Sequence, residues 1–246
     1  MRAIVLAGAF VIALATAAFA ADGVIEINQA RAMAGGVTPG DTPGFPVTIS
    51  LPGSYRLTGN LTTTSTNDAG ILLGADNVTI DLNGFAISVG SSGIYGPQHK
   101  NIRVANGSIM AGYQGIVLED LAHVERVRVI GVATTSRSGI QAGQDAIVSG
   151  CLVSDFTVVG ISALSGVITG NVVTSNRVGI GINDGLVTSN SIYNNTGMGL
   201  SGFFSPVSHA GYSGNNFLGN NGGLTTPQVS GGLQIGPNMC NRALCP

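Results

Sequence analysis

The stretch from Gly160 to Asn195, GISALSGVITGNVVTSNRVGIGINDGLVTSNSIYNN, decides the fold of this chain. It holds two successive units that each begin with Gly followed by Ile, at Gly160 and at Gly179. Within each unit, short runs of alternating apolar residues are separated by Gly, Ser and Asn. This pattern is typical of short strands that bury one face and end at turns.

The same Gly–aliphatic pair recurs along most of the chain at spacings of 19 to 24 residues. The pairs begin at Gly70, Gly93, Gly115, Gly139, Gly160, Gly179, Gly199 and Gly223. Such units are too short for a strand–helix–strand crossover, and their strands are too short to form a stable sheet alone. Stacking solves both problems, because backbone groups then pair between turns and the apolar faces line one core.

The repeat therefore predicts an all-β protein, a β-solenoid with one repeat per turn and about 4.8 Å between turns. A β-sandwich is the alternative, because turn signals in sandwiches also recur at regular spacing. The constant phase of the Gly–aliphatic pair favours the solenoid.

Asparagines keep the same phase as the repeat. They form two series, Asn171, Asn190 and Asn215 after one strand and Asn176, Asn195 and Asn220 after the next. Stacked amides can hydrogen-bond from one turn to the next, and Asn tolerates the left-handed backbone of tight bends. We expect both series to be structural ladders.

The N-terminal residues 1–20 have the pattern of a signal peptide. Arg2 precedes an apolar run, and Ala18-Phe19-Ala20 matches a cleavage site. A membrane anchor is the alternative, but the run is shorter than the roughly 20 apolar residues that span a bilayer. The protein is therefore expected to be secreted, into the periplasm or the medium, and to have no membrane span.

The rest of the chain divides into three parts. Residues 21–46 are expected to form an N-terminal cap and linker, with a short helix that starts at Asn28 and stops at Gly35 or Gly36. Residues 47–235 are expected to form the parallel β-helix, and residues 236–246 a C-terminal cap. A solenoid needs caps because its end turns would otherwise expose unpaired strands.

The three cysteines fit an oxidising compartment. Cys240 and Cys245 are close enough in the sequence for a small disulfide loop in the C-terminal cap. A metal site is the alternative, but no His lies near them, and we expect neither a metal nor a cofactor. Cys151 lies between apolar residues and is expected to be a buried free thiol.

Composition limits the possible functions. Charged residues make up 9% of the chain, against about 25% in an average soluble domain, and the formal net charge is -2. Nucleic acid is not an expected partner, because phosphate binding takes clustered Lys and Arg and Lys100 is the only lysine.

Charge is concentrated between residues 99 and 128. This segment contains Lys100, Arg103, Glu119, Asp120, Glu125, Arg126 and Arg128, together with His99 and His123. Treating Ile80 and Ile102 as equivalent places Asp81 beside Arg103, with Arg126 or Arg128 one turn further. The cluster is either a surface ion-pair ladder or a site where arginines hold uronate carboxylates and a His acts as acid or base.

The repeats, of the form G-I-x(n)-V-x-G/S-N-x-V, and the strand NVTIDLNGF at 77–85 resemble right-handed parallel β-helix proteins of the pectate-lyase-like superfamily. The stretch from Ile27 to Thr62 is similar to secreted bacterial members of unassigned activity. The resemblance covers most of residues 24–246 and implies a right-handed coil. It does not fix an activity, because the superfamily includes lyases, hydrolases, epimerases and noncatalytic adhesins.

The signatures of the catalytic members are incomplete in this sequence. It has no column of Asp or Glu for Ca²⁺, and it has neither the Gly-His-Gly segment nor the paired aspartates of the polygalacturonase-like hydrolases. The segment Tyr95-Gly-Pro-Gln-His99 is similar to the Tyr…Asp-Pro-His signature of mannuronan epimerases, but it lacks the Asp.

Three functional hypotheses follow. The first is an exported β-helix that binds or scaffolds polysaccharide at the cell surface without catalysis. The second is a polysaccharide lyase or epimerase acting on uronate-containing glycans. Its candidate catalytic residues are His99, Lys100, Arg103, Arg126 and Arg128, and its candidate ligand-binding residues are Tyr95, Tyr113, Asp81 and His123. The third is a structural or adhesion protein of the cell surface.

Overall fold

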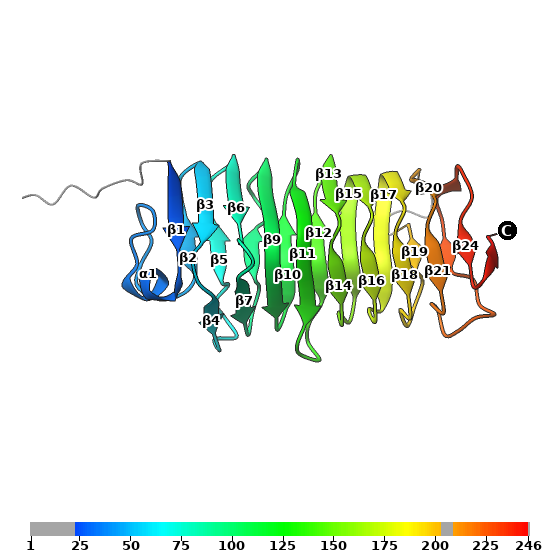
Figure 1. Ribbon diagram of the computed structural model, residues 1–246, viewed down its shortest axis with the longest axis horizontal. Coiled ribbons are helices and arrows are strands. Elements are labelled where there is room, and N and C mark those ends of the chain that lie inside the picture. The colour runs from blue at the N-terminus through cyan, green and yellow to red at the C-terminus, as the bar shows by residue number, and fades with distance from the viewer. Residues whose placement is uncertain (1–22, 203–208, 246) are drawn as a thin grey trace, which may run out of the picture.

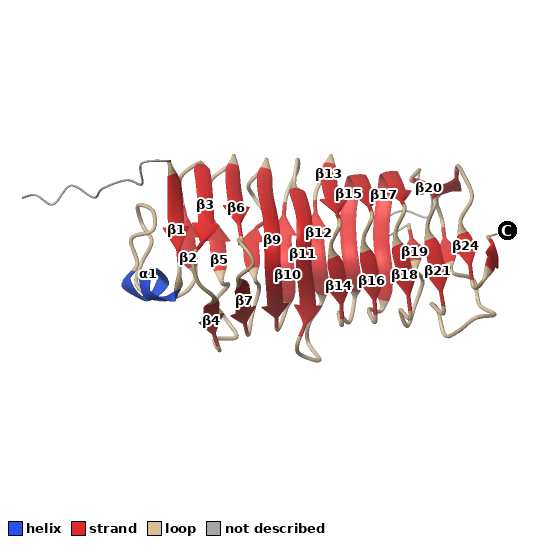
Figure 2. Ribbon diagram, in the orientation of Figure 1, coloured by secondary structure: helices blue, strands red, loops and turns tan. Residues whose placement is uncertain are grey.

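The computed structural model describes residues 23–202 and 209–245. These residues form a β-solenoid of about nine turns, in which parallel strands stack from one turn to the next (Figure 1). Within the described part of the chain, α1 (Gln29–Ala34) is the one helix (Figure 2). The predicted all-β solenoid is confirmed, whereas the predicted signal peptide at residues 1–20 lies outside the described residues.

Each turn contributes up to three strands, so the solenoid has three faces. The first face carries the Gly–aliphatic repeat. It consists of β2 (Val47–Ile49), β5 (Ile71–Leu73), β8 (Ile94–Gly96), β10 (Gln114–Leu118), β12 (Ser138–Ala142), the first halves of β15 (Val159–Thr169) and β17 (Val178–Thr188), β19 (Leu200–Ser201) and β22 (Val229–Ser230).

The second face follows the first along each turn. It consists of β1 (Val24–Ile27), β3 (Gly53–Leu57), β6 (Val78–Asp81), the first halves of β9 (Ile102–Ala111) and β11 (His123–Gly131), β13 (Ala146–Ser149), the second halves of β15 and β17, β20 (Gly211–Ser213) and β23 (Leu233–Gln234).

The third face completes each turn. It consists of β4 (Leu61–Thr63), β7 (Ala86–Val89), the second halves of β9 and β11, β14 (Leu152–Ser154), β16 (Val172–Thr174), β18 (Ser191–Tyr193), β21 (Asn216–Leu218) and β24 (Met239–Cys240). Parallel pairing therefore reaches beyond residues 47–235 at both ends.

The isoleucines of the repeat form one inward column on the first face. Ile71, Ile94, Ile116, Ile140, Ile161 and Ile180 pair in register and are fully buried. The glycine before each isoleucine allows close approach of the next turn. A Cβ on Gly160 would lie 2.7 Å from Val173 Cγ1 and 2.8 Å from the carbonyl oxygen of Gly179. The repeat is therefore a packing requirement of the stacked turns.

The last predicted repeat, at Gly223, is wrong. Leu200 pairs with Val229 and not with Leu224. The chain makes a longer turn before Val229 because Gln228 must reach Asn220: its Oε1 accepts the Asn220 backbone N–H at 2.9 Å. A Gly–Leu pair that lies in this turn matches the repeat in letters but not in position.

Both asparagine ladders are confirmed, and each is longer than predicted. The first runs Asn171, Asn190, Asn215 and Asn238, and the second runs Asn176, Asn195, Asn220 and Gln228. All eight side chains are buried. The oxygens of Asn171 and Asn176 each accept one backbone N–H from the turn before, from Cys151 and Phe156. Every later side-chain oxygen accepts both a backbone N–H and a side-chain amide N–H, so the ladders replace strand pairing at two corners.

The N-terminal end is capped by side chains. Asn28 starts α1 by accepting the Arg31 backbone N–H at 3.0 Å, and the helix stops at Gly35, as predicted. Gln29 on this helix exchanges two hydrogen bonds with the backbone of Thr62 in β4. Asp41 accepts the backbone N–H of Thr48 in β2 at 2.7 Å. These side chains occupy the outer edges of β2 and β4.

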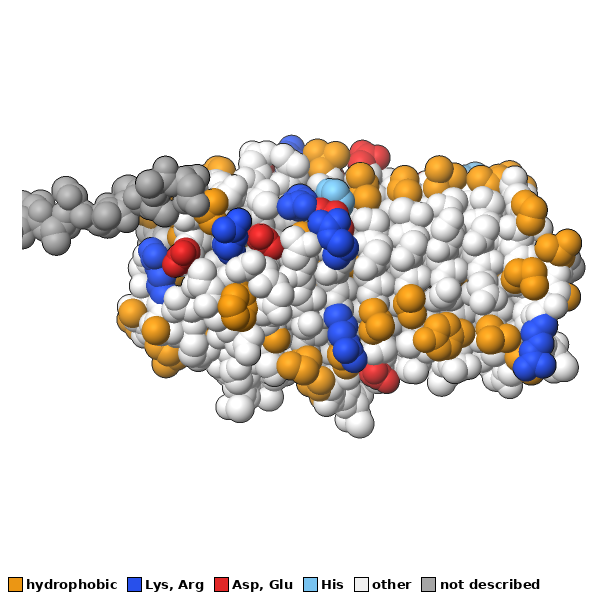
Figure 3. All heavy atoms as spheres, in the orientation of Figure 1, with side chains coloured by type: hydrophobic (Ala, Val, Ile, Leu, Met, Phe, Trp, Pro, Cys, Tyr) orange, Lys and Arg blue, Asp and Glu red, His pale blue; other side chains and the backbone are white. Residues whose placement is uncertain are grey.

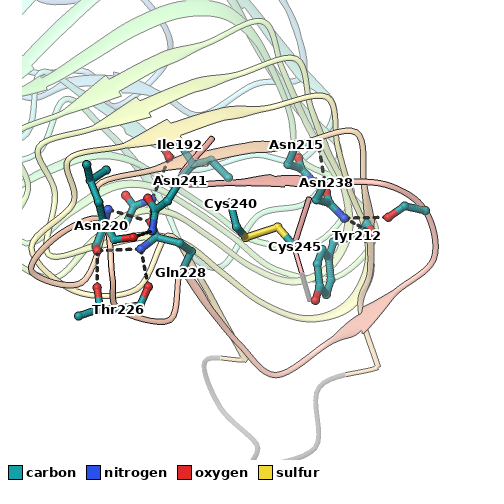
Figure 4. The surroundings of a disulfide bond; sticks show 12 residues. Ile192, Tyr212, Asn215, Asn220, Thr226, Gln228, Asn238, Cys240, Asn241 and Cys245 are labelled. Atoms are coloured by element: carbon teal, nitrogen blue, oxygen red, sulfur yellow. Dashed lines mark hydrogen bonds between the residues drawn. A yellow bond between two sulfur atoms is a disulfide. The ribbon is translucent and has the colours of Figure 1, made fainter. Parts of the chain in front are cut away.

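The C-terminal end closes with a short hairpin. β24 pairs antiparallel with β25 (Ala243–Leu244), and the predicted disulfide between Cys240 and Cys245 links the hairpin (Figure 4). Cys151 is buried and free, also as predicted. Within the described residues, no helix is long and apolar enough to cross a membrane.

Candidate functional site

Of the charged residues singled out in the sequence, Arg103, His123 and Glu125 lie on strands of the second face. Figure 3 shows charged side chains close together in the N-terminal half of the molecule. The prediction that Asp81 and Arg103 are neighbours is wrong. Ile80 pairs with Val104, so Arg103 lies beside Thr79 and Asp81 lies beside Ala105. The error is a slip of two residues, which keeps every side chain on its correct side of the sheet and leaves the apolar pattern unchanged.

The arginines of this region are held by acidic partners. Arg103 and Arg126 both bond Glu125, one to each carboxylate oxygen, and Arg126 does so at 2.5 Å. Arg126 Nε also donates to Asn106 Oδ1 at 2.9 Å. Asn106 in turn donates to Asp81 at 3.1 Å. We call this connected set the charged ladder.

The charged ladder extends one turn further toward the N-terminus. Arg56 Nε lies 3.5 Å from Asp81 Oδ2, whose other oxygen also accepts the Asn83 backbone N–H. Arg126 reaches its partners because it occupies a corner with a φ of 52°. The same corner is occupied by Asn106 one turn before and by Gly150 one turn after, both with positive φ. A left-handed residue therefore turns the chain here on successive turns.

Electrostatics of the charged ladder follow from this pairing. Burial raises the pKa of Glu125, but the hydrogen bond and charge of Arg103 and the charge of Arg126 outweigh it and hold that pKa below its ordinary value. At Asp81, burial likewise raises the pKa, and hydrogen bonds from Asn106 and Asn83 outweigh it. Both groups are held as carboxylates that neutralise the arginines.

His99 and Lys100 lie apart from the charged ladder, in the connection that follows β8. His99 Nδ1 lies 3.1 Å from Asp76 Oδ1, and that oxygen also accepts the Lys100 backbone N–H at 3.1 Å. The backbone N–H of Lys100 and the imidazole of His99 hold the pKa of Asp76 below its ordinary value. The carboxylate–imidazole contact orients the His99 ring, with its Nε2 on the opposite edge.

The remaining candidates lie on different faces. His123 lies on β11 beside Arg103, on the second face. Arg128 lies on the same strand beyond the corner, beside Ser108 on the third face. Tyr95 lies on β8 of the first face, between Leu72 and Val117. The structure thus brings together Asp81, Arg103, His123 and Arg126, and it does not join them to His99, Lys100, Arg128 or Tyr95.

Tyr113 lies at the corner between the third and first faces, where Arg137 of the next turn covers it. The Arg137 guanidinium lies 5.8 Å from the centre of the Tyr113 ring, and its Nη1 donates to the phenol oxygen at 3.0 Å. The cation and the ring therefore form one unit that combines an apolar surface with hydrogen-bond donors.

A groove of about 640 Å³ lies further along the same corner. We call it the Arg177 groove. The segment from Gly131 to Thr134 forms part of its wall, and its polar lining is Thr134, Asp155, Thr157, Ser175, Asn176, Arg177 and Thr196. Asp155 and Arg177 are both exposed, and no ion pair involves either side chain among the described residues. The arginines of the charged ladder, in contrast, are all paired with carboxylates.

The residues Arg137, Asp155 and Arg177 were not predicted as site residues. A signal for two of them was present in the sequence. Tyr113, Arg137 and Arg177 each lie two residues before the glycine of a Gly–aliphatic pair, which places all three at the same corner of their turns. Asp155 has no comparable signal, because its position follows from the turn after β14.

The described residues contain no group of three or more His, Cys, Asp or Glu side chains arranged to hold a metal ion. No protein-family model, no curated protein and no solved structure matches this chain.

Proposed function

We propose that the protein is an exported right-handed parallel β-helix of the pectate-lyase-like type that binds or scaffolds polysaccharide at the cell surface, without catalysis. We propose further that the glycan lies along the corner between the third and first faces. The observation that carries this proposal is the Arg177 groove, in which a carboxylate and a guanidinium face solvent together without a salt bridge to satisfy either of them.

The chemistry of this groove suits neutral sugar hydroxyls. A carboxylate accepts two hydroxyl hydrogen bonds and a guanidinium donates several in a fixed plane, so Asp155 and Arg177 can each hold vicinal hydroxyls. Threonine hydroxyls beside them add donors and acceptors. A glycan made mainly of uronates fits less well, because Asp155 would repel its carboxylates.

The Tyr113–Arg137 unit lies on the same corner, toward the N-terminus. Turns of a solenoid rise by about 4.8 Å, so Arg137 and Arg177, two turns apart, are separated by about 10 Å along the axis. An extended glycan running parallel to the axis would meet first the tyrosine ring and then the groove. This arrangement supports binding of several sugar units at once.

The charged ladder supports a structural role for the other arginines. Arg103 and Arg126 share the carboxylate of Glu125, so holding a uronate would require them to break an existing ion pair. Breaking a hydrogen-bonded pair without full replacement costs free energy. This favours the noncatalytic hypothesis over a uronate site built on these side chains.

A lyase or epimerase is the second candidate, because Asp76 contacts His99 at 3.1 Å. Such a pair can act as a general base when the substrate reaches the free imidazole nitrogen. Lys100 is the nearest cation in the sequence that could balance a substrate carboxylate. A structural or adhesion role is the third candidate and predicts neither glycan binding nor product.

The test combines binding and turnover. The purified protein is applied to an array of neutral and uronate-containing glycans, alongside the variants Arg177→Ala and Asp155→Ala and the control Arg242→Ala. We expect binding to neutral glycans that weakens at least tenfold in the two groove variants and is unchanged in the control.

Turnover is followed on uronate polymers by the ultraviolet absorbance of unsaturated product. Product that disappears in His99→Ala would establish the lyase candidate and overturn the noncatalytic proposal. Absence of both binding and product would leave the structural role. If glycan binding persists in both groove variants, the glycan does not bind at this corner, and that part of the proposal is wrong.

A further inference from the structure

The two ends of the solenoid are finished differently. At the N-terminal end, Gln29 and Asp41 occupy the outer edges of β4 and β2, and α1 lies beside them. At the C-terminal end, no strand and no capping side chain covers the outer edges of β22 and β23 among the described residues. The C-terminal end is therefore the open end of the stack.

Large apolar side chains gather at this open end (Figure 3). The exposed ones are Leu224, Leu233, Ile235, Met239 and Leu244, with Leu244 at 69% and Leu233 at 66% of full exposure. Isolated exposed leucines are normal on a protein surface, but these five belong to the last turn and its flanking segments, with Leu233 on the second face and Met239 on the third. Apolar side chains gathered around one end of the stack are typical of an interaction surface.

The same end contains a cavity of about 620 Å³. Its lining includes Tyr212, Val229, Ala243 and the disulfide of Cys240 and Cys245, and Figure 4 shows the tyrosine ring and the disulfide side by side at this end. Ala243 and Cys245 face the cavity, whereas Leu244 between them is exposed. The end thus presents both a hollow and protruding leucines beside it.

Charge favours self-association through this end. Arg242 is the only Asp, Glu, Lys or Arg after Asp184 in the sequence. A contact in which one surface meets a copy of itself brings like charges together, and this surface has almost none to oppose the contact. At the N-terminal end, in contrast, side chains occupy the outer edges of β2 and β4, so strand pairing with the open end cannot continue on the first and third faces.

We propose that the open end binds the open end of a second copy, giving a tail-to-tail dimer with twofold symmetry. In this dimer the protruding leucines of one protomer lie at the hollow of the other, and twofold symmetry makes both contacts at once. The contact does not depend on glycan binding. It leaves the Arg177 groove of both protomers on the outside.

Analytical ultracentrifugation of the full chain over a wide concentration range tests the proposal. We expect a reversible monomer–dimer equilibrium. Leu244→Glu places a charge in the contact and is expected to weaken dimerisation at least tenfold, about 1.4 kcal/mol. The matched control is Leu51→Glu, at an apolar residue with 44% exposure between β2 and β3 at the opposite end, and it is expected to dimerise normally.

Small-angle X-ray scattering distinguishes the geometry. A tail-to-tail dimer has close to twice the maximum dimension of the monomer, and a side-by-side dimer does not. A second variant, Leu233→Glu, keeps the test sound if Leu244→Glu fails to fold. The proposal is overturned by a monomer at all concentrations, by filaments that grow beyond the dimer, by a side-by-side shape, or by a dimer that survives in the folded variants.

Discussion

The side-chain oxygen of Asn190 accepts two hydrogen bonds from Asn171, one from its backbone N–H at 2.9 Å and one from its side-chain amide at 3.0 Å. The two residues are 19 positions apart and occupy the same corner of adjacent turns. Both side chains are buried. The corner therefore depends on the amide where other proteins would use a strand pair or a bound water.

Replacing Asn190 by Ala tests this dependence. The substitution removes the acceptor of the buried Asn171 backbone N–H and of one of its two amide hydrogens, while the other amide hydrogen keeps the Val148 carbonyl oxygen. Each buried unsatisfied donor costs about 1–3 kcal/mol. We expect the free energy of unfolding to fall by about 3 kcal/mol, measured by denaturant titration. Asn67→Ala is the control, because Asn67 is exposed and its side chain makes no ladder contact. Equal losses in both variants would contradict a special role for the ladder.

A glycine of the repeat provides a second prediction. In Gly160→Ala the new methyl group meets Val173 and the backbone of Gly179, and neither can move without disturbing the next turn. Overpacking of this kind costs about 1–3 kcal/mol. Gly74→Ala is the matched control, because its Cβ would lie 3.6 Å from the nearest atom, an ordinary contact. Thermal melting should show a loss for Gly160→Ala and little change for Gly74→Ala.

Acid sensitivity is expected from the charged ladder. The pKa of Glu125 is lowered in the folded protein from its ordinary value of 4.5, so its carboxylate stabilises the fold above that pH. The stabilisation is lost as the pH falls through the folded value, because the protonated acid no longer balances Arg103 and Arg126. Glu125→Gln should therefore lower the melting temperature at pH 7. The melting temperature of this variant should also fall less than that of the wild type as the pH is lowered. Glu119→Gln, which removes a carboxylate outside the ladder, should preserve the wild-type profile.

Cys151 is expected to resist thiol reagents. Burial raises the pKa of its thiol to about 11, so the reactive thiolate is scarce at neutral pH, and the sulfur is also shielded by the core. Ellman's reagent should detect no thiol in the native protein and one per chain after unfolding without reductant. Rapid labelling of the native protein would show that the core opens near this residue.

Removal of the disulfide should act locally. Cys240 and Cys245 enclose a short loop, for which the loss of cross-linking is about 2 kcal/mol. In the double variant Cys240→Ser/Cys245→Ser, amide hydrogen exchange should rise in β24 and β25. Protection in the central turns should be unchanged, because each turn contacts only its neighbours. Faster exchange throughout the chain would contradict this local role.

The sequence allowed the coil to be predicted because its structural demands repeat at one phase. Gly160 and Gly179 each have the next turn above them, and Asn171 and Asn190 each end the same kind of strand. Structural features that occur only once, outside the repeat, were harder to predict. Among the described strands β1 pairs with β3 alone, and its residues precede the repeats that begin at Gly70.

The period of the repeat could not predict the exact strand register or which charged side chains would form pairs. The pairing of Asp81 with Ala105 differs from the predicted one by two residues, and both alignments bury the same apolar side chains. The candidate groove depends on Asp155 and Arg177, which line it from adjacent turns and belong to no common motif. The phase of the repeat predicts that Arg177 lies at this corner, but it does not predict that Asp155 lines the same groove.

The spacing of the two asparagine ladders has a consequence for how the length of this protein can change. Residues 171–189 form one complete 19-residue module, and removing them would bring Asn190 to the place of Asn171 with its acceptor, Asn215, still one turn away. Removing this module shortens the solenoid by one turn, and the turns on either side of the deletion can then stack directly on each other. Gain or loss of such modules would let evolution adjust the reach of the protein while both of its ends stay unchanged.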